Sequence, residues 1–220
     1  MYGKEVAMID VATSQIKSKE RVAERGEVFT AEREVNAMLD LVKQETERID
    51  SRFLEPACGN GNFLVEILRR KLALVSNDQE MVQAVCSIYG IDIMQDNVEE
   101  CQERLLSIIT EHYGKIDGEL LQTVRYVLQR NILWGDALTL CEPLSTDEQE
   151  AEPITFSEWG FIADMVKRKD YHLAALLQAQ TTSVPDLFSD LGDDAYLPPK
   201  PCKEYKPIHY LKIYTQDANQ

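Results

Sequence analysis

Residues 53–64 read Phe-Leu-Glu-Pro-Ala-Cys-Gly-Asn-Gly-Asn-Phe-Leu, which predicts a short strand, a tight turn and a helix in immediate succession. The turn contains Gly59 and Gly61, and apolar residues at helical spacing follow between Phe63 and Val75. Glycine tolerates backbone angles that other residues avoid, and it lets a ligand approach the main chain. Because ligands of open parallel sheets bind beyond the carboxyl ends of the strands, this turn is the first candidate site.

A short apolar strand that ends near an acidic residue recurs twice further along the chain. Residues 88–93 read Ile-Tyr-Gly-Ile-Asp-Ile, and residues 131–136 read Asn-Ile-Leu-Trp-Gly-Asp. Amphipathic helices are predicted at about 98–112 and 119–129, between these strands. Helices that alternate with strands indicate crossover connections, so we predict an α/β fold with a mostly parallel open sheet and helices on both faces.

The second half of the chain has weaker patterns. We predict an acidic loop at 142–153, a strand at 154–156, a charged turn at 167–169 and a helix at 170–180, with a late strand at 208–214. The resulting division is an N-terminal polar segment (1–28), a core domain (29–180) and a proline-rich tail that includes the late strand (181–220).

Composition limits the classes of function. The formal charge is -15 and the pI is near 4.6, so tight binding of nucleic acid by charge alone is not expected. The sequence has neither an apolar run of the roughly 18 residues that span a bilayer nor a secretion signal, and we predict a cytoplasmic protein without a membrane partner. Its five cysteines are scattered, which indicates reduced thiols and no metal site.

The residues at the strand ends favour a positively charged nucleoside as ligand. A P-loop is excluded because no Lys-Ser/Thr pair follows the glycines, and the dinucleotide fingerprint fails because residue 64 is Leu. Glu55 offers a carboxylate to the ammonium and sulfonium of S-adenosylmethionine, and Asp92 is placed to accept ribose hydroxyls if Asp96 or Asn97 caps the next helix. The alternative is an ordinary strand-turn-helix joint with a helix-capping Asp92.

Four motifs in a fixed order resemble the cofactor-binding part of adenine-N6 DNA methyltransferases, in the branch of type I modification subunits and fused type II enzymes. They are Gly-Glu-Val-Phe-Thr at 26–30, Glu-Pro-Ala-Cys-Gly-Asn-Gly-Asn-Phe-Leu at 55–64, Gly-Ile-Asp-Ile at 90–93 and Gly-Asp-Ala-Leu at 135–138. The resemblance covers roughly residues 20–140, and it departs from the family at Ala31, where proline is usual. It implies a Rossmann-like methyltransferase fold, S-adenosyl-L-methionine as cofactor, and DNA as substrate through a partner recognition subunit.

The resemblance also implies roles for ten positions. Phe29 and Thr30 would line the methionine end of the cofactor, and Asp92 and Ile93 would hold the ribose and adenine. The remaining six would form the turn around the methionine moiety (Glu55, Ala57, Gly59, Gly61) and meet the adenine edge (Asp136, Ala137).

The catalytic tetrad of that family, Asn/Asp/Ser-Pro-Pro-Tyr/Phe, is missing from the sequence. Its task is to accept the two hydrogens of the adenine amine and to stack on the flipped base. The only Pro-Pro pair, at 198–199, has neither a preceding acceptor nor a following aromatic residue. Ser157, Glu158 and Trp159 are the nearest substitutes; the alternative is that Trp159 anchors the core and Glu158 is solvated.

Three functions remain open on the sequence. The first is adenine-N6 DNA methylation related to restriction and modification, with a catalytic motif that is divergent or supplied elsewhere. The second is a catalytically inactive module that binds the cofactor and serves as a regulatory or scaffold subunit. The third is methyl transfer to protein, RNA or a small molecule, which an acidic chain also suits.

Overall fold

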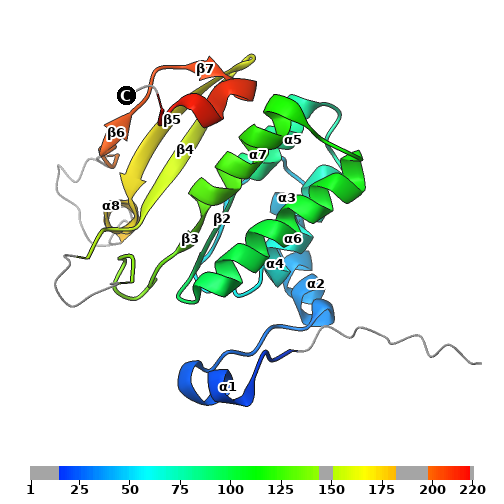
Figure 1. Cartoon of the computed structure of the whole chain (residues 1–220), viewed down its shortest axis with the longest axis vertical. Helices are drawn as coiled ribbons and strands as arrows, with labels where there is room; N and C mark the ends of the chain where they lie inside the picture. Colours follow the sequence, from blue (N-terminus) through cyan, green and yellow to red (C-terminus); the bar gives the residue numbers. More distant parts are fainter. Residues whose placement is uncertain (1–14, 144–150, 182–197, 219–220) are drawn as a thin grey trace, which may run out of the picture.

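The computed structural model describes residues 15–143, 151–181 and 198–218, which form an α/β structure with two sheets (Figure 1). The rest of the predicted polar segment, acidic loop and tail lies outside the described residues. The first sheet is parallel, and its strands β1 (Phe53–Glu55), β2 (Ile88–Asp92) and β3 (Ile132–Trp134) lie in the order β1-β2-β3. This part of the fold agrees with the alternating pattern of the sequence.

Helices join the parallel strands as crossover connections. α4 (Asn62–Leu72) and α5 (Asp78–Cys86) lead from β1 to β2, and α6 (Gln95–Tyr113) and α7 (Gly118–Asn131) lead from β2 to β3. Near the N-terminus lie α1 (Lys19–Arg25), α2 (Glu32–Asp40) and α3 (Lys43–Thr46). Ser18 begins α1 by accepting a hydrogen bond from the Arg21 amide, and Gly26 ends it in the left-handed conformation.

The later strands form a separate antiparallel sheet, where the sequence predicted one mostly parallel sheet. β4 (Thr155–Ile162) and β5 (Met165–His172) make a hairpin, and β6 (Lys203–Glu204) and β7 (Ile208–His209) pair with β5. The hairpin turn is too short for a parallel crossover, which takes a dozen or more residues. Residues 203–209 therefore belong to the same sheet as the hairpin, although they fall in the predicted tail.

Two local predictions in this region were wrong. Residues 167–169 lie inside β5 and not in a turn, so the helix that follows, α8 (Leu173–Thr181), begins later than expected. The predicted strand at 208–214 is only β7 and then continues as a 3-10 helix, η1 (Tyr210–Thr215), which packs on α7.

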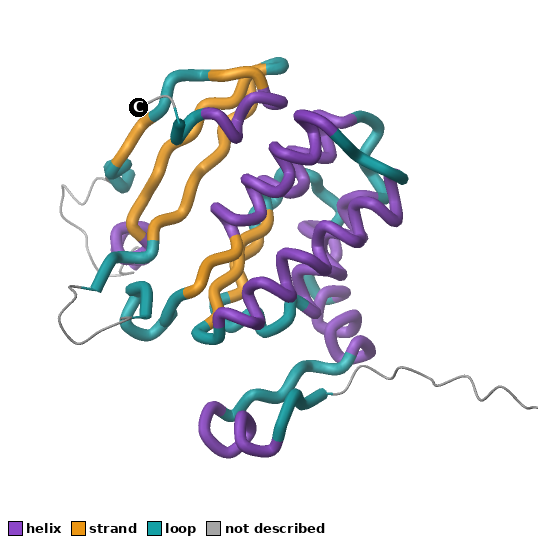
Figure 2. The backbone as a smooth tube through the Cα atoms, in the orientation of Figure 1, coloured by secondary structure: helices purple, strands orange, loops and turns teal. Residues whose placement is uncertain are grey.

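The two faces of the parallel sheet have different coverings. On one face, α4 and α6 pack on β2, and a Cβ added to Gly90 would lie 2.9 Å from Leu64 of α4. On the other, Tyr89 contacts Phe156 of β4 with ring centroids 5.3 Å apart, and its hydroxyl donates to the Ser157 carbonyl. On this face the second sheet packs against β2 at Tyr89, where the sequence predicted a helix layer. Figure 2 shows the strands of the two sheets as separate groups.

A buried cation links the second sheet to the end of the described chain. Arg168 of β5 is 0% exposed and pairs with Asp170 (2.6 Å) and with Asp217 (2.9 Å). Its guanidinium also lies 4.1 Å from the ring centroid of Tyr205. A buried charge is tolerated only when it is paired, so these contacts compensate the desolvation of Arg168.

Lys71 of α4 is a second buried cation, and it is 0% exposed. Its amine donates to the carbonyls of Ile49 and Ser51 and to the Ser87 hydroxyl (2.7 Å). These bonds tie α4 to the segment before β1 and to the residue before β2. Burial lowers the pKa of Lys71 to about 8.

We expect the free energy of unfolding of the wild-type protein to rise, relative to that of a Lys71→Met variant, as the pH increases above 8. Between a folded pKa of about 8 and the ordinary value of 10.5, the unfolded chain binds a proton that the folded protein has lost. The relative gain should be on the order of 1 kcal/mol over the first one or two pH units. Urea unfolding at a series of pH values measures it, and parallel curves for the two proteins would contradict it.

Candidate functional site

A cavity of about 280 Å³ lies where the glycine turn meets the carboxyl ends of β1 and β2. It brings together positions that are separated by more than sixty residues in the chain. Of the ten positions predicted to hold a cofactor, seven line it: Phe29, Thr30, Glu55, Ala57, Gly59, Asp92 and Ile93.

The glycine turn needs both of its glycines for steric reasons. Gly59 and Gly61 have φ angles of 52° and 90°, in the left-handed region that side chains disfavour. A Cβ on Gly59 would lie 2.9 Å from the ring of Phe29, and one on Gly61 would lie 2.5 Å from the sulfur of Cys101 in α6. Gly61 therefore serves the packing of the turn on α6 and does not line the cavity.

Asp92 is the acceptor that organises the site. One carboxylate oxygen accepts from the Gly59 amide (2.8 Å), and the other accepts from the Met94 amide (2.8 Å) and the Asn97 side chain (3.2 Å). The expectation that Asp96 or Asn97 caps the next helix was wrong, because Met94 is the N-cap residue of α6 and no side chain caps the helix. Since a carboxylate has about four acceptor positions, Asp92 retains about one for a ligand.

Glu55 lies beside the turn with a carboxylate that no cation balances. It is half-buried, and it accepts a hydrogen bond from the Ala57 amide at 3.3 Å. No Lys or Arg of the described residues forms an ion pair with it. Burial raises the pKa of the Glu55 carboxyl, and a positively charged ligand group would favour its ionised form.

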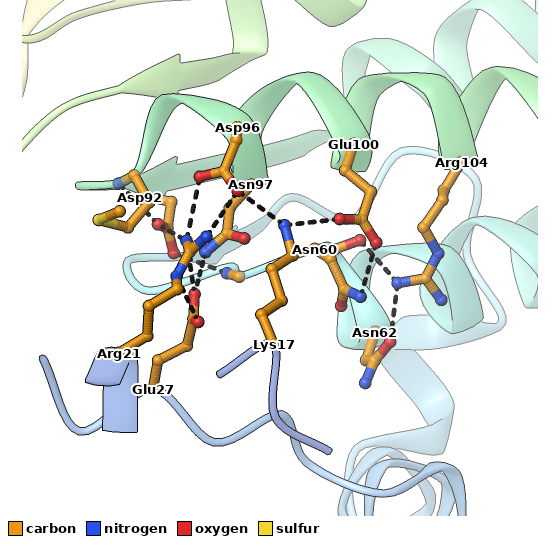
Figure 3. Close-up of polar contacts among 12 residues, drawn as sticks. Lys17, Arg21, Glu27, Asn60, Asn62, Asp92, Asp96, Asn97, Glu100 and Arg104 are labelled. Atoms are coloured by element: carbon orange, nitrogen blue, oxygen red, sulfur yellow. Dashed lines mark hydrogen bonds and ion pairs between the residues drawn. The ribbon is translucent and has the colours of Figure 1, made fainter. Parts of the chain in front are cut away.

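The N-terminal arm, which we define as residues 15–30, lines one side of the cavity. Polar contacts hold this arm against α6 (Figure 3). Lys17 pairs with Asp96 (3.1 Å) and Glu100 (2.7 Å) of α6, and Arg21 pairs with Asp96 and with Glu27 of the arm itself (both 2.7 Å). The arm thereby contributes Glu27 as well as the predicted Phe29 and Thr30 to the cavity wall.

Sequence reasoning did not predict Glu27 or Asn97 as site residues, and it considered Asn97 only as a helix cap, although both line the cavity. Asn97 lies in the first turn of α6, where polar residues usually cap or face solvent. Glu27 stands within the quoted motif at 26–30, but only the folded arm brings it to 2.7 Å from the Asn97 amide nitrogen. No spacing in the sequence indicates this contact.

The tip of the third strand lies next to the site without lining the cavity. The Gly135 amide donates to the Asp92 carbonyl (3.0 Å), and the Trp134 indole donates to the Ile93 carbonyl (2.9 Å). Asp136 instead accepts from the Leu138 amide (2.8 Å) in its own turn. The structure therefore does not bring Asp136 and Ala137 into the cavity with the other predicted residues.

The three catalytic candidates lie away from the glycine turn. Ser157 is buried and donates to Asp170 (2.7 Å), and the Trp159 indole donates to Asn131 at the end of α7 (3.0 Å). Glu158 pairs with Arg52 (2.8 Å), which precedes β1, whereas the glycine turn follows the opposite end of that strand. These contacts match the alternative of Trp159 as a core anchor.

Other features of the described residues add no second centre of this kind. A larger cavity of about 600 Å³ lies between the two sheets and carries Arg52, Glu158 and Tyr171 among mainly apolar residues. Within the described ranges, no three His, Cys, Asp or Glu side chains are grouped so that they could hold a metal ion. The helices of this part of the chain are all too short or too polar to cross a membrane.

Comparison with known proteins yields no relative. No family model, no curated protein and no solved structure matches the chain. Any functional assignment therefore depends on the motifs and on the geometry of the cavity.

We expect Gly61→Ala to lower the free energy of unfolding by about 2–4 kcal/mol, since it adds a steric clash to the cost of a left-handed backbone. Gly26→Ala is the matched control, because Gly26 is also left-handed (φ 66°) but a Cβ there would meet nothing within 4 Å. This control should lose only about 1 kcal/mol. Urea unfolding measures both variants, and equal losses would contradict the packing role of Gly61.

Proposed function

We propose that the chain binds S-adenosyl-L-methionine in the glycine-turn cavity and serves the methylation of adenine N6 in DNA, with catalytic groups that are divergent or supplied elsewhere. The observation that carries this proposal is the convergence of seven predicted positions, from Phe29 to Ile93, on one cavity. The Rossmann-like methyltransferase fold is part of the proposal, and the parallel order β1-β2-β3 with its ligand cavity at the carboxyl ends supports it.

The chemistry of the cavity wall fits this cofactor. Glu55 offers an unbalanced carboxylate for the ammonium group, and the half-exposed Ile93 offers apolar surface to the adenine ring. The described residues that line the cavity include no Lys or Arg, so a cofactor that carries phosphate groups fits less well. The volume of about 280 Å³ is close to the lower end of small-molecule sites, at roughly 300 Å³.

When bound, the cofactor supplies an activated methyl group on its sulfonium. The residues of this chain would hold and orient it: Glu55 balances its positive charge, and Asp92 fixes the glycine turn while it accepts a ribose hydroxyl. With a net charge of -15, the chain needs a basic partner to hold DNA, which is why a recognition subunit belongs to the proposal.

We expect Glu55→Gln to weaken the binding of S-adenosylmethionine about tenfold or more, because it removes a charge-assisted contact at a half-buried position. Isothermal titration calorimetry measures the affinity. The control is Glu111→Gln, which removes the same charge at an exposed position of α6 outside the cavity and should bind like wild type. Equal affinities for all three proteins would contradict the role of Glu55, and no binding to wild type would contradict the proposed function.

A second candidate function is a catalytically inactive module that binds the cofactor and regulates or scaffolds a larger complex. The internal hydrogen bonds of Ser157 and Trp159 favour it, since they leave neither side chain free at the cavity. Both candidates share the cofactor site and differ only in methyl transfer.

Transfer of a labelled methyl group to mixed-sequence duplex DNA separates the two candidates. The chain alone should transfer none, since the candidates for the missing tetrad, Ser157, Glu158 and Trp159, do not line the cavity. Addition of the neighbouring gene products should produce N6-methyladenine. Cofactor binding without transfer in every combination would establish the inactive module, and label on protein or RNA would contradict both.

A further inference from the structure

Recognition of a ribose diol requires two acceptors, and Asp92 has room for about one more hydrogen bond. It is 9% exposed, and the Gly59 amide, the Met94 amide and the Asn97 side chain already donate to it. A single carboxylate that holds both hydroxyls would need more free acceptor positions than these contacts leave.

Asn97 supplies a second acceptor directly beside Asp92. Its side chain is 2% exposed, and its amide nitrogen donates to Glu27 (2.7 Å) and Asp92 (3.2 Å). Because both neighbours are carboxylates, which accept only, the nitrogen must face them and the orientation of the amide is fixed. The amide oxygen is buried without a partner among the described residues, although buried acceptors are nearly always satisfied.

The carboxylate that holds Asn97 is itself held by the N-terminal arm. Glu27 pairs with Arg21 at 2.7 Å, and Arg21 also pairs with Asp96 of α6 at 2.7 Å, as Figure 3 shows. Glu27 and Arg21 therefore act as positioning residues for the Asn97 amide. The same arm lines the cavity through Phe29 and Thr30. One segment therefore both forms part of the cavity wall and orients the Asn97 amide.

We propose that Asp92 and Asn97 share the ribose diol of the bound cofactor, with one hydroxyl donating to the free position on Asp92 and the other to the amide oxygen of Asn97. This inference rests on the proposed function, and it makes Asn97 a residue that determines the specificity for a ribonucleoside. The Glu27–Arg21 pair of the arm sets the direction of the Asn97 amide.

The test combines changes in the ligand with changes in the protein. Calorimetry compares S-adenosylhomocysteine with its 2′-deoxy and 3′-deoxy analogues on wild type and on Asn97→Leu. Wild type should lose about tenfold in affinity for each analogue, since each leaves a buried acceptor unpaired. Asn97→Leu should bind the parent ligand about tenfold more weakly and should no longer distinguish it from one of the two analogues.

Two further variants separate this role from a general effect on folding. Gln95→Leu changes an exposed amide in the same turn of α6, whose contact is Glu99, and should bind like wild type. Glu27→Gln retains an acceptor for Asn97 and removes the ion pair to Arg21. It should therefore lower the affinity for S-adenosylhomocysteine, and each deoxy analogue should still bind more weakly than this parent ligand. The analogue series on wild type needs no variant to fold.

Each remaining outcome has a defined meaning. The inference is wrong if wild type binds S-adenosylhomocysteine and both deoxy analogues with equal affinity. It is also wrong if Asn97→Leu loses as much affinity for each of the two analogues as wild type does. In either case the proposed function stands. If wild type binds neither S-adenosylmethionine nor S-adenosylhomocysteine, the proposed function is wrong and the inference fails with it.

Discussion

The hydrogen bond from the Gly59 amide to the Asp92 carboxylate, at 2.8 Å, holds the candidate site together. It joins the turn after β1 to the end of β2, and a second bond from the Cys58 amide to the Ile91 carbonyl (2.8 Å) supports it. Because these contacts fix the turn against the sheet, Gly59 must lie close to Phe29 of the arm, and Gly61 must lie close to Cys101 of α6. The cavity is the space that remains between the two strand ends and the arm.

Charge is distributed unevenly around this site. The chain carries -15 overall, yet the arm places Lys17 and Arg21 against the acidic first turns of α6. Ion pairs that are partly exposed contribute little stability individually, but here several share partners and act on one segment. Their main consequence is geometric, since they hold the arm where it completes the cavity wall and leave the carboxylate of Glu55 unbalanced for a ligand.

The sequence predicted the parallel half of the fold because its strands are short apolar runs and its helices have clear amphipathic periods. In the second sheet, the predicted strands at 154–156 and 208–214 overlap β4 and β7, but β5 was missed because it buries Arg168 and Asp170, so that its inward face has a polar sequence. Within the site, the glycine turn, Glu55 and Asp92 followed from motif positions. The contact between Asn97 and Glu27 could not be predicted, since it depends on an arm that folds back over the strand ends.

The buried guanidinium of Arg168 has a consequence for how the molecule opens. Its partners come from three separate stretches: Asp170 on its own strand, the Tyr126 hydroxyl on α7, and Asp217 beyond η1. Detachment of any one stretch would remove a hydrogen-bonding partner from a guanidinium that is 0% exposed, which is costly. Transient fluctuations should therefore release the hairpin, the end of α7 and the residues after η1 together, as one cooperative unit and not by stepwise fraying.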